Sequence, residues 1–173
     1  MKYTTAFAVP FWSGQYGLNY DYDKAIQKCE QLGSCTVDLL SYDEFKPIHN
    51  ELVTRVDAVC NSIDRRFNLR IGDARIIINR PATEIRYDLE STMTLIHWMK
   101  VSKQTGRITF LAGNLMEQSK TFDLYQCQLF QSRTQFMPST GKLVIYPSWV
   151  LNFIEESDPE DYNISLEIPL YQK

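Results

Sequence analysis

The spacing of apolar residues changes from helical to strand-like about one third of the way along the chain. Between residues 41 and 63, apolar side chains recur every three or four positions, which is the spacing of one buried helix face. Ser41 and Glu44 fit a capping box at the start of this helix, and Pro47 is expected in its first turn. A shorter helix is predicted over residues 21–32. The side chains expected to face inward are those of Ile26, Cys29, Leu32, Ile48, Leu52, Val56, Val59 and Ile63.

From about residue 67 onward, short apolar runs alternate with turn signals such as Gly72-Asp73 and Gly113-Asn114, a pattern typical of strands. The first residues, "YTTAFAVPFWSGQYG", predict a short strand or extended arm followed by loops. We therefore expect one α+β, mainly β domain over residues 1–173, with a helical layer over about 21–63 and strands over about 67–171. Its predicted architecture is a double-stranded β-helix (jelly roll) with two N-terminal helices packed on one sheet. The runs predicted to be strands are 67–71, 74–79, 84–89, 94–102, 107–113, 121–130, 142–148, 149–156 and 163–172.

Charge and cysteine usage narrow the class of protein. The net charge is -3, with Lys+Arg 18 against Asp+Glu 21, so no excess of positive charge is available for binding nucleic acid directly. No apolar run approaches the ~20 residues that a membrane-spanning helix needs. The cysteines show no Cys-x-x-Cys spacing, so we expect four reduced thiols in a protein made in a cytoplasm. They are Cys29, Cys35, Cys60 and Cys127.

Residues for nucleophilic catalysis are scarce. The sequence has only His49 and His97, and it contains no Gly-x-Ser-x-Gly elbow and no glycine-rich phosphate loop. His49, on the flank of the longer helix, is expected to be a surface or structural residue. His97 lies within a predicted strand, where it is either buried with a partner or facing a cavity.

The C-terminal third carries the most specific motif. The stretch "MPSTGKLVIYPSWVLNFI", with its corner Pro147, Ser148 and Trp149, resembles a motif of the 2-oxoglutarate and iron(II)-dependent oxygenases found in marine bacteria and tailed phages. The opening "FAVPFW" and the closing "SLEIPL" are similar to the first and last strands of that family. The resemblance implies a double-stranded β-helix. Independently of it, Trp149 and Tyr146 are both expected to be core and corner residues rather than stacking platforms.

The same resemblance places the family's functional positions on this chain. Asn152 falls on the second iron-binding histidine, and Asn163 falls on the arginine that holds the oxoglutarate carboxylate. In "RYDLESTMTLIHW", Arg86 falls on the first histidine and Asp88 on the second metal-ligand position. Three of these four positions differ from the family, so the resemblance implies that neither the metal nor the cosubstrate is bound.

Ligand chemistry gives the same expectation without the family. A facial iron(II) site needs two imidazoles and a carboxylate, whereas Asn is a weak neutral donor and the cationic Arg86 would repel the metal ion. No histidine follows His97 in the sequence. An alternative ligand set made of Asp88 and His97 remains open, although it lacks a third ligand.

These observations favour a non-catalytic structural or interaction protein. Because the resemblance is to a family frequent in tailed phages, we expect a virion component of the neck, collar or tail, made in the host cytoplasm and present in several symmetric copies with other protein subunits as partners. Aromatic residues near the N-terminus are candidate interface anchors, namely Tyr3, Phe11, Trp12, Tyr16, Tyr20 and Tyr22.

Two alternatives remain. The first is an active hydroxylase acting on a protein or small molecule. The second is a ligand-binding jelly roll of the cupin kind, with an open pocket lined by Arg86, Asp88, His97 and Asn152; a cavity filled by side chains would exclude it.

Overall fold

Two sheets and a helical layer make up the described part of the chain. The computed structural model describes residues 2–6, 9–15, 22–64, 67–78, 88–102, 106–111, 133–154 and 163–173. Within them lie α1 (Tyr22–Leu32), η1 (Leu39–Ser41), α2 (Lys46–Ile63), β1 (Lys2–Ala6), β2 (Val9–Gln15), β3 (Thr36–Val37), β4 (Leu69–Ile71), β5 (Ala74–Ile78), β6 (Met93–Lys100), β7 (Ile108–Leu111), β8 (Arg133–Phe136), β9 (Lys142–Pro147), β10 (Leu151–Ile154) and β11 (Ile164–Gln172).

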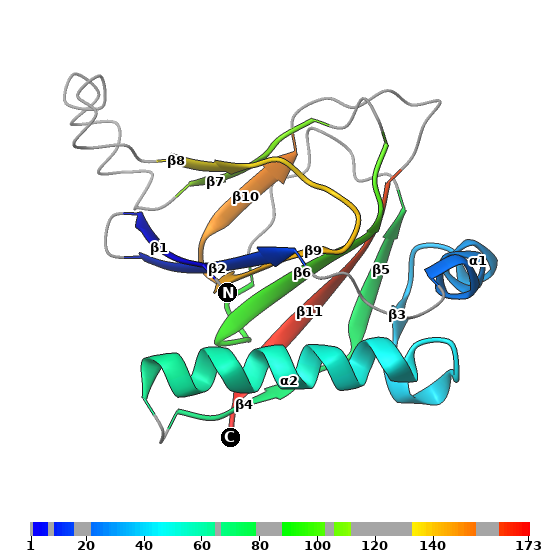
Figure 1. Cartoon of the computed structure of the whole chain (residues 1–173), viewed down its shortest axis with the longest axis horizontal. Coiled ribbons are helices and arrows are strands. Elements are labelled where there is room, and N and C mark those ends of the chain that lie inside the picture. Colours follow the sequence, from blue (N-terminus) through cyan, green and yellow to red (C-terminus); the bar gives the residue numbers. More distant parts are fainter. Residues whose placement is uncertain are drawn as a thin grey trace.

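The strands form a large sheet and a small sheet, as the jelly-roll prediction requires. The large sheet has the order β1-β2-β9-β6-β11-β5-β3, with β4 also paired to β11, and the small sheet has the order β10-β7-β8. All pairings are antiparallel. Figure 1 shows the small sheet lying over β1, β2 and β9 of the large one. The chain therefore has the predicted double-stranded β-helix.

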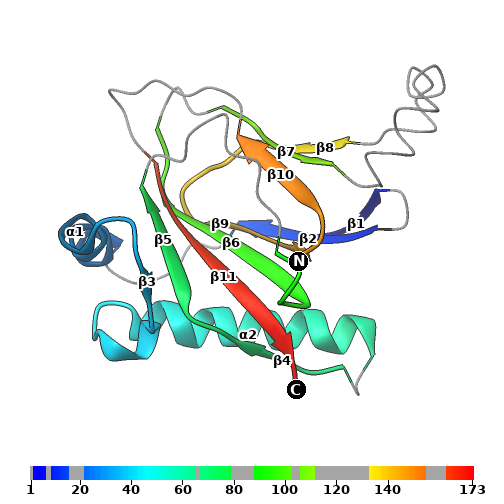
Figure 2. The same cartoon turned by 180° about the vertical axis from the view of Figure 1, so that it is seen from behind.

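The two helices cover one face of the large sheet. In Figure 1 α2 crosses in front of β4 and β11, and in Figure 2 the same strands cross in front of α2. The buried face of α2 is the predicted one, Ile48, Leu52, Val56 and Val59, and it packs on sheet residues such as Leu95. Ile63 was predicted to face inward, but it is 45% exposed because it lies in the last turn, where α2 ends.

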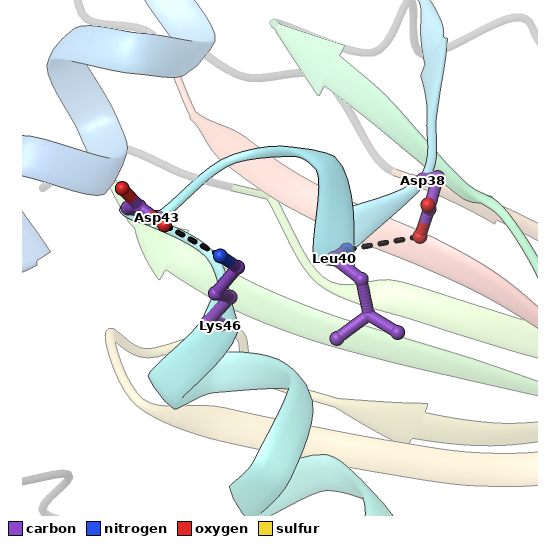
Figure 3. Close-up of polar contacts among 4 residues, drawn as sticks. All are labelled: Asp38, Leu40, Asp43 and Lys46. Carbon is purple, nitrogen blue, oxygen red and sulfur yellow. Dashed lines mark hydrogen bonds and ion pairs between the residues drawn. The ribbon is translucent and has the colours of Figure 1, made fainter.

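The predicted capping box before α2 is wrong, because a separate 3-10 turn intervenes. Asp38 accepts a 2.9 Å hydrogen bond from the backbone N–H of Leu40 and so caps η1, as Figure 3 shows. Asp43 accepts a 2.6 Å hydrogen bond from Lys46 just before the helix. The N-cap of α2 is Phe45, with no side-chain cap, and Pro47 lies in the first turn as expected.

An aromatic cluster fills the space between the two sheets. The ring centroids of Phe110 and Tyr146 are 4.6 Å apart, and those of Phe11 and Phe110 are 5.3 Å apart, both edge-to-face. Ile96, Trp98, Ile108, Val144, Val150 and Ile154 complete this inter-sheet core.

The N-terminal segment corrects one expectation. Residues 2–6 and 9–15 pair as a hairpin, and β2 joins the large sheet beside β9. Phe11 and Trp12, expected to be exposed anchors, are buried at 1% and 3% exposure, because the strand sends them into opposite cores. Trp12 donates a 3.1 Å hydrogen bond to Ser62 of α2. Tyr22 is half-buried, and the side chains of Tyr3, Tyr16 and Tyr20 lie outside the described residues.

Other local predictions had mixed outcomes. β8 was not expected. Of the run predicted over 84–89, residues 84–87 lie outside the described part of the chain, and residues 88 and 89 are not in a strand, because a bend begins at Leu89. Run 121–130, with Cys127, lies outside the described residues, whereas Cys29, Cys35 and Cys60 are free thiols as expected. Among the described helices, neither combines the length and apolar character required to cross a bilayer.

Candidate functional site

The Pro-Ser-Trp corner carries the chain from the large sheet to the small one. β9 ends at Pro147, and the backbone N–H of Val150 donates a 3.0 Å hydrogen bond to the carbonyl of Pro147, which closes the turn. Ser148 is buried at 1% exposure, whereas Trp149 is 51% exposed. Tyr146 is a core residue, as predicted, but the prediction that Trp149 is also part of the core is wrong, because the turn leaves its side chain exposed.

Asp88 is bound into this corner by a network of hydroxyl groups. Ser91 donates a 2.6 Å hydrogen bond to the carboxylate of Asp88, and the Ser91 hydroxyl lies 2.7 Å from that of Ser148. Thr94 donates a 2.9 Å hydrogen bond to Ser148. The backbone N–H of Asp88 also donates a 2.9 Å hydrogen bond to the carbonyl of Ser148.

These contacts keep the Asp88 carboxylate charged. Burial acts to raise the pKa of Asp88, but hydrogen bonds from the Ser91 hydroxyl and from the backbone N–H groups of Glu90 and Ser91 lower it below its ordinary value. At neutral pH the corner therefore carries a fixed negative charge beside an uncharged serine pair.

Asn152 points into the aromatic inter-sheet core. It is fully buried, lies opposite Phe110 in the β10-β7 register, and its side-chain amide donates a 3.0 Å hydrogen bond to the hydroxyl of Tyr146. Because Tyr146 belongs to the large sheet and Asn152 to the small one, this bond joins the two sheets. The amide of Asn152 and the hydroxyl of Tyr146 thus form a hydrogen bond in a buried place where an amide without a partner would reduce the stability of the fold.

Asn163 has a similar structural contact at the start of β11. Its side-chain oxygen accepts a 2.7 Å hydrogen bond from the backbone N–H of Ser102, just beyond the end of β6. The side chain is 8% exposed. The Asn163 side chain thus links the segment just before β11 to the segment just after β6.

His97 lies on the opposite face of the large sheet from Asp88. Along β6, Met93, Leu95 and Met99 belong to the core beneath the helices, so His97 faces the same way, and its Nε2 lies 3.3 Å from the hydroxyl of Tyr22 in α1. Thr94, which joins the Asp88 network, faces the other side. The structure therefore does not bring Asp88 and His97 together.

The buried environment of His97 lowers the pKa of its imidazole. Full burial lowers its pKa to about 4, while a hydrogen bond to the backbone of Lys142 acts in the opposite direction. The side chain is neutral at physiological pH.

The residues of this site do not fit a facial iron centre. Both histidines of the chain belong to the helical side of the large sheet, His49 on α2 and His97 toward α1, so neither imidazole reaches the inter-sheet space. Within the described ranges, no group of three His, Cys, Asp or Glu side chains is arranged to hold a metal ion. Arg86 lies outside the described residues. The pocket expected for a cupin-like site is not assembled by Asp88, His97 and Asn152, since these three lie in separate environments.

Sequence reasoning missed a polar groove beside the corner. Its volume is about 730 Å³, and its lining residues come from β3, β4, β5, β6 and β11 and from the residues that precede β6. Arg75 and Glu167 lie opposite each other in its wall, and Asp88 reaches it from the corner. The single charged residue within each otherwise apolar run, Arg75 in "ARIII" and Glu167 in "SLEIPLY", is the signal that could have indicated a second polar face.

Comparisons with known proteins agree with this fold. No family model matches the sequence, and no curated protein matches it in sequence. Among solved structures, a prolyl-4-hydroxylase from Pseudomonas putida superposes with a TM-score of 0.64 at 10% identity, covering 94% of this chain and 88% of that one. A viral collagen prolyl hydroxylase from Paramecium bursaria Chlorella virus-1 gives 0.61 at 10% identity, covering 92% and 88%.

An enzyme with a different chemistry is equally similar. SnoN, a non-heme α-ketoglutarate-dependent epimerase of nogalamycin biosynthesis, gives a TM-score of 0.66 at 9% identity, covering 93% of this chain and 78% of that one. Identities near 10% establish common architecture and leave the chemistry open. The chain thus has the double-stranded β-helix fold shared by 2-oxoglutarate and iron(II)-dependent oxygenases.

Proposed function

We propose that this protein uses the oxygenase fold without catalysis and acts by binding other protein subunits. The observation that supports this most is the buried hydrogen bond between Asn152 and Tyr146. At the position where the family resemblance expects an iron-binding imidazole, the chain has an amide whose N–H donates to a phenol within an aromatic core.

Packing around this bond argues in the same direction. A facial iron site keeps coordination positions open for the cosubstrate and oxygen. Here, the rings of Phe11, Phe110 and Tyr146 occupy the inter-sheet space beside Asn152. Such packing stabilises the sandwich, as expected for a scaffold.

The biological setting comes from the sequence resemblance. We infer a tailed-phage virion component of the neck, collar or tail, made in the host cytoplasm and then built into the particle in several symmetric copies. Peptide mass spectrometry of purified particles from the phage that encodes the chain tests this setting. We expect the chain at a stoichiometry of several copies per particle; its absence from particles would refute the setting.

The alternative, an active hydroxylase, makes a separate prediction. Oxygenases that depend on 2-oxoglutarate and iron(II) convert 2-oxoglutarate and O2 to succinate and CO2. Incubation with iron(II), ascorbate and 2-oxoglutarate, followed by NMR, should yield no succinate above the level of a protein-free sample. Succinate formation that is lost in Asp88→Ala would refute the non-catalytic proposal.

A further inference from the structure

The groove of about 730 Å³ lies on the face of the large sheet that the helices do not cover. Glu167 and Pro169 of β11 line it, whereas Leu166 and Ile168, which alternate with them, belong to the core beneath the helices. The volume is in the range of ligand-binding clefts, about 300–1,000 Å³. The groove is open to solvent, since many of its lining side chains are exposed, namely those of Thr36, Arg70, Asp73, Arg75 and Glu90.

Opposite charges balance each other on the side of the groove formed by β4, β5 and β11. The guanidinium of Arg70 lies 4.6 Å from the ring centroid of Tyr171. Arg75 lies opposite Glu167 in the β5-β11 pairing. Asp73, between β4 and β5, also lines this side, which therefore has two arginines and two carboxylates. The net charge of this side is close to zero.

The corner side of the groove carries an excess of negative charge. Asp88 and Glu90 precede β6, and both line the groove. Burial acts to raise the pKa of Asp88, but hydrogen bonds from the Ser91 hydroxyl and from backbone N–H groups hold it below its ordinary value, so this carboxylate is charged at neutral pH. Within the described ranges, neither Asp88 nor Glu90 forms an ion pair. The uncompensated charge of the groove is thus located at the corner.

Both sides of the groove are held in place by hydrogen bonds within the chain. The backbone N–H of Asp88 donates a 2.9 Å hydrogen bond to the carbonyl of Ser148. The backbone N–H of Gly72 donates a 2.9 Å hydrogen bond to the carbonyl of Pro169, and a Cβ at Gly72 would lie 2.7 Å from the ring of Tyr171. Because these walls are already fixed, binding in the groove costs little conformational entropy.

Apolar surface accompanies the negative charge at the corner. Leu89, which lies between the two corner carboxylates in the sequence, is 75% exposed, and Pro169 and Tyr171 line the groove itself. Lysine and arginine side chains combine a charged head with an apolar stem that packs along apolar surface. A small inorganic cation would match the charge of the groove but would leave this apolar surface uncovered.

We propose that the groove binds a basic, lysine- or arginine-bearing segment of a partner protein. The cationic heads of the segment approach the carboxylates of Asp88 and Glu90, while its side-chain stems pack on the apolar surface beside them. Complementary charges of this kind select the partner and speed its association. This inference rests on the proposed function, which it deepens by naming the chemistry of the partner surface.

Fluorescence anisotropy with a labelled hexalysine peptide tests the site on the full chain. We expect saturable binding that weakens as salt is added, because salt screens exposed charges. Glu90→Gln should weaken binding about twofold to fivefold, since it removes one carboxylate of the corner. The hydrogen bond that Glu90 contributes to Asp88 comes from its backbone N–H and is retained in this variant. Arg75→Gln should strengthen binding by a similar factor, because it removes a cation from the groove.

Asp57→Asn is the matched control. Asp57 is exposed on α2, which covers the other face of the large sheet, so this substitution removes one negative charge from the chain away from the groove. It should leave the affinity for hexalysine unchanged, and near-UV circular dichroism should show native packing in all three variants. Absence of hexalysine binding would overturn the inference. Equal weakening by Asp57→Asn and Glu90→Gln would also overturn it, because the peptide would then follow the net charge of the chain.

The two proposals can fail separately. Iron(II) binding by a chain whose affinity for hexalysine falls in Glu90→Gln would refute the non-catalytic function and leave the basic-segment site in place. A chain that binds neither iron(II) nor hexalysine would refute the site alone.

Discussion

The side-chain amide of Asn152 donates a 3.0 Å hydrogen bond to the hydroxyl of Tyr146, and this contact joins the small sheet to the large one inside an aromatic core. Both residues are at most 1% exposed. A polar pair in such surroundings is stabilising only while both partners remain, because removal of one leaves the other desolvated.

The Asn152–Tyr146 pair should therefore show energetic coupling. Asn152→Ala is expected to lower the free energy of unfolding by about 2–3 kcal/mol and Tyr146→Phe by about 1–2 kcal/mol. The double variant should lose less than the sum of the two losses, since Tyr146→Phe removes the hydroxyl that Asn152→Ala leaves unpaired. Urea denaturation of the four proteins measures the coupling. Strict additivity would mean that the bond contributes nothing to stability.

The stability of the protein should depend on Ser148, which lies at the centre of the hydroxyl network at the corner. Ser148→Ala removes the group that contacts both Ser91 and Thr94, and we expect a loss of about 1–3 kcal/mol in thermal or urea unfolding. Thr140→Ala, at an exposed position in the turn before β9, is the control and should change stability by less than about 0.5 kcal/mol. Equal effects of the two substitutions would contradict the role of the network.

Burial of His97 predicts how stability changes with pH. In the unfolded chain this group titrates at its ordinary value of 6.5, whereas in the folded chain its pKa is about 4. Between these values the unfolded state binds a proton that the folded state does not. Stability is thus fully present above pH 6.5 and is lost as the pH falls toward 4.

The size of this effect can be isolated by substitution. The folded and unfolded pKa values of His97 correspond to about 3 kcal/mol over the window. His97→Gln should remove most of this slope while retaining a polar group near Tyr22, and His49→Gln controls for the loss of a histidine elsewhere. Urea midpoints at several pH values give the measurement, and an undiminished slope in His97→Gln would contradict this assignment.

The close approach at Gly72 should make that position intolerant of a side chain. In Gly72→Ala the new Cβ would meet the Tyr171 ring at 2.7 Å and the Pro169 carbonyl oxygen at 3.1 Å, so the groove wall must shift. We expect a loss of about 1–3 kcal/mol in unfolding experiments. A stability equal to that of the wild-type chain would mean that Tyr171 moves freely and that the groove wall is not fixed.

Apolar periodicity was sufficient to predict the helices and most strands. The spacing of Ile48, Leu52, Val56 and Val59 identified the buried face of α2, because a helix repeats its contacts every three to four residues. The exposure of Ile63 could not be predicted from this spacing, because it follows from the end of α2 at that residue. Asp38, which caps η1, preceded the expected capping box and was overlooked.

The pairing of strands that are distant in the sequence determines the burial and direction of several side chains, which local patterns could not predict. Phe11 and Trp12 have the composition of an exposed aromatic arm, yet pairing of β2 with β9 buries both. His97 was correctly placed in a strand, but its direction depended on which face of β6 the helices cover. Trp149 was predicted, with Tyr146, to be a core and corner residue, but its place in the turn leaves its side chain exposed.

We propose that the inter-sheet space of this oxygenase fold holds no iron site. Anaerobic titration of iron(II) into the purified chain by calorimetry, with and without 2-oxoglutarate, tests it most directly. Asp88→Ala and His97→Ala serve as variants of the two remaining candidate ligands. We predict no binding heat beyond dilution in any of these proteins. Micromolar binding to the wild-type chain that weakens in Asp88→Ala and His97→Ala would contradict the claim and identify a functional metal centre.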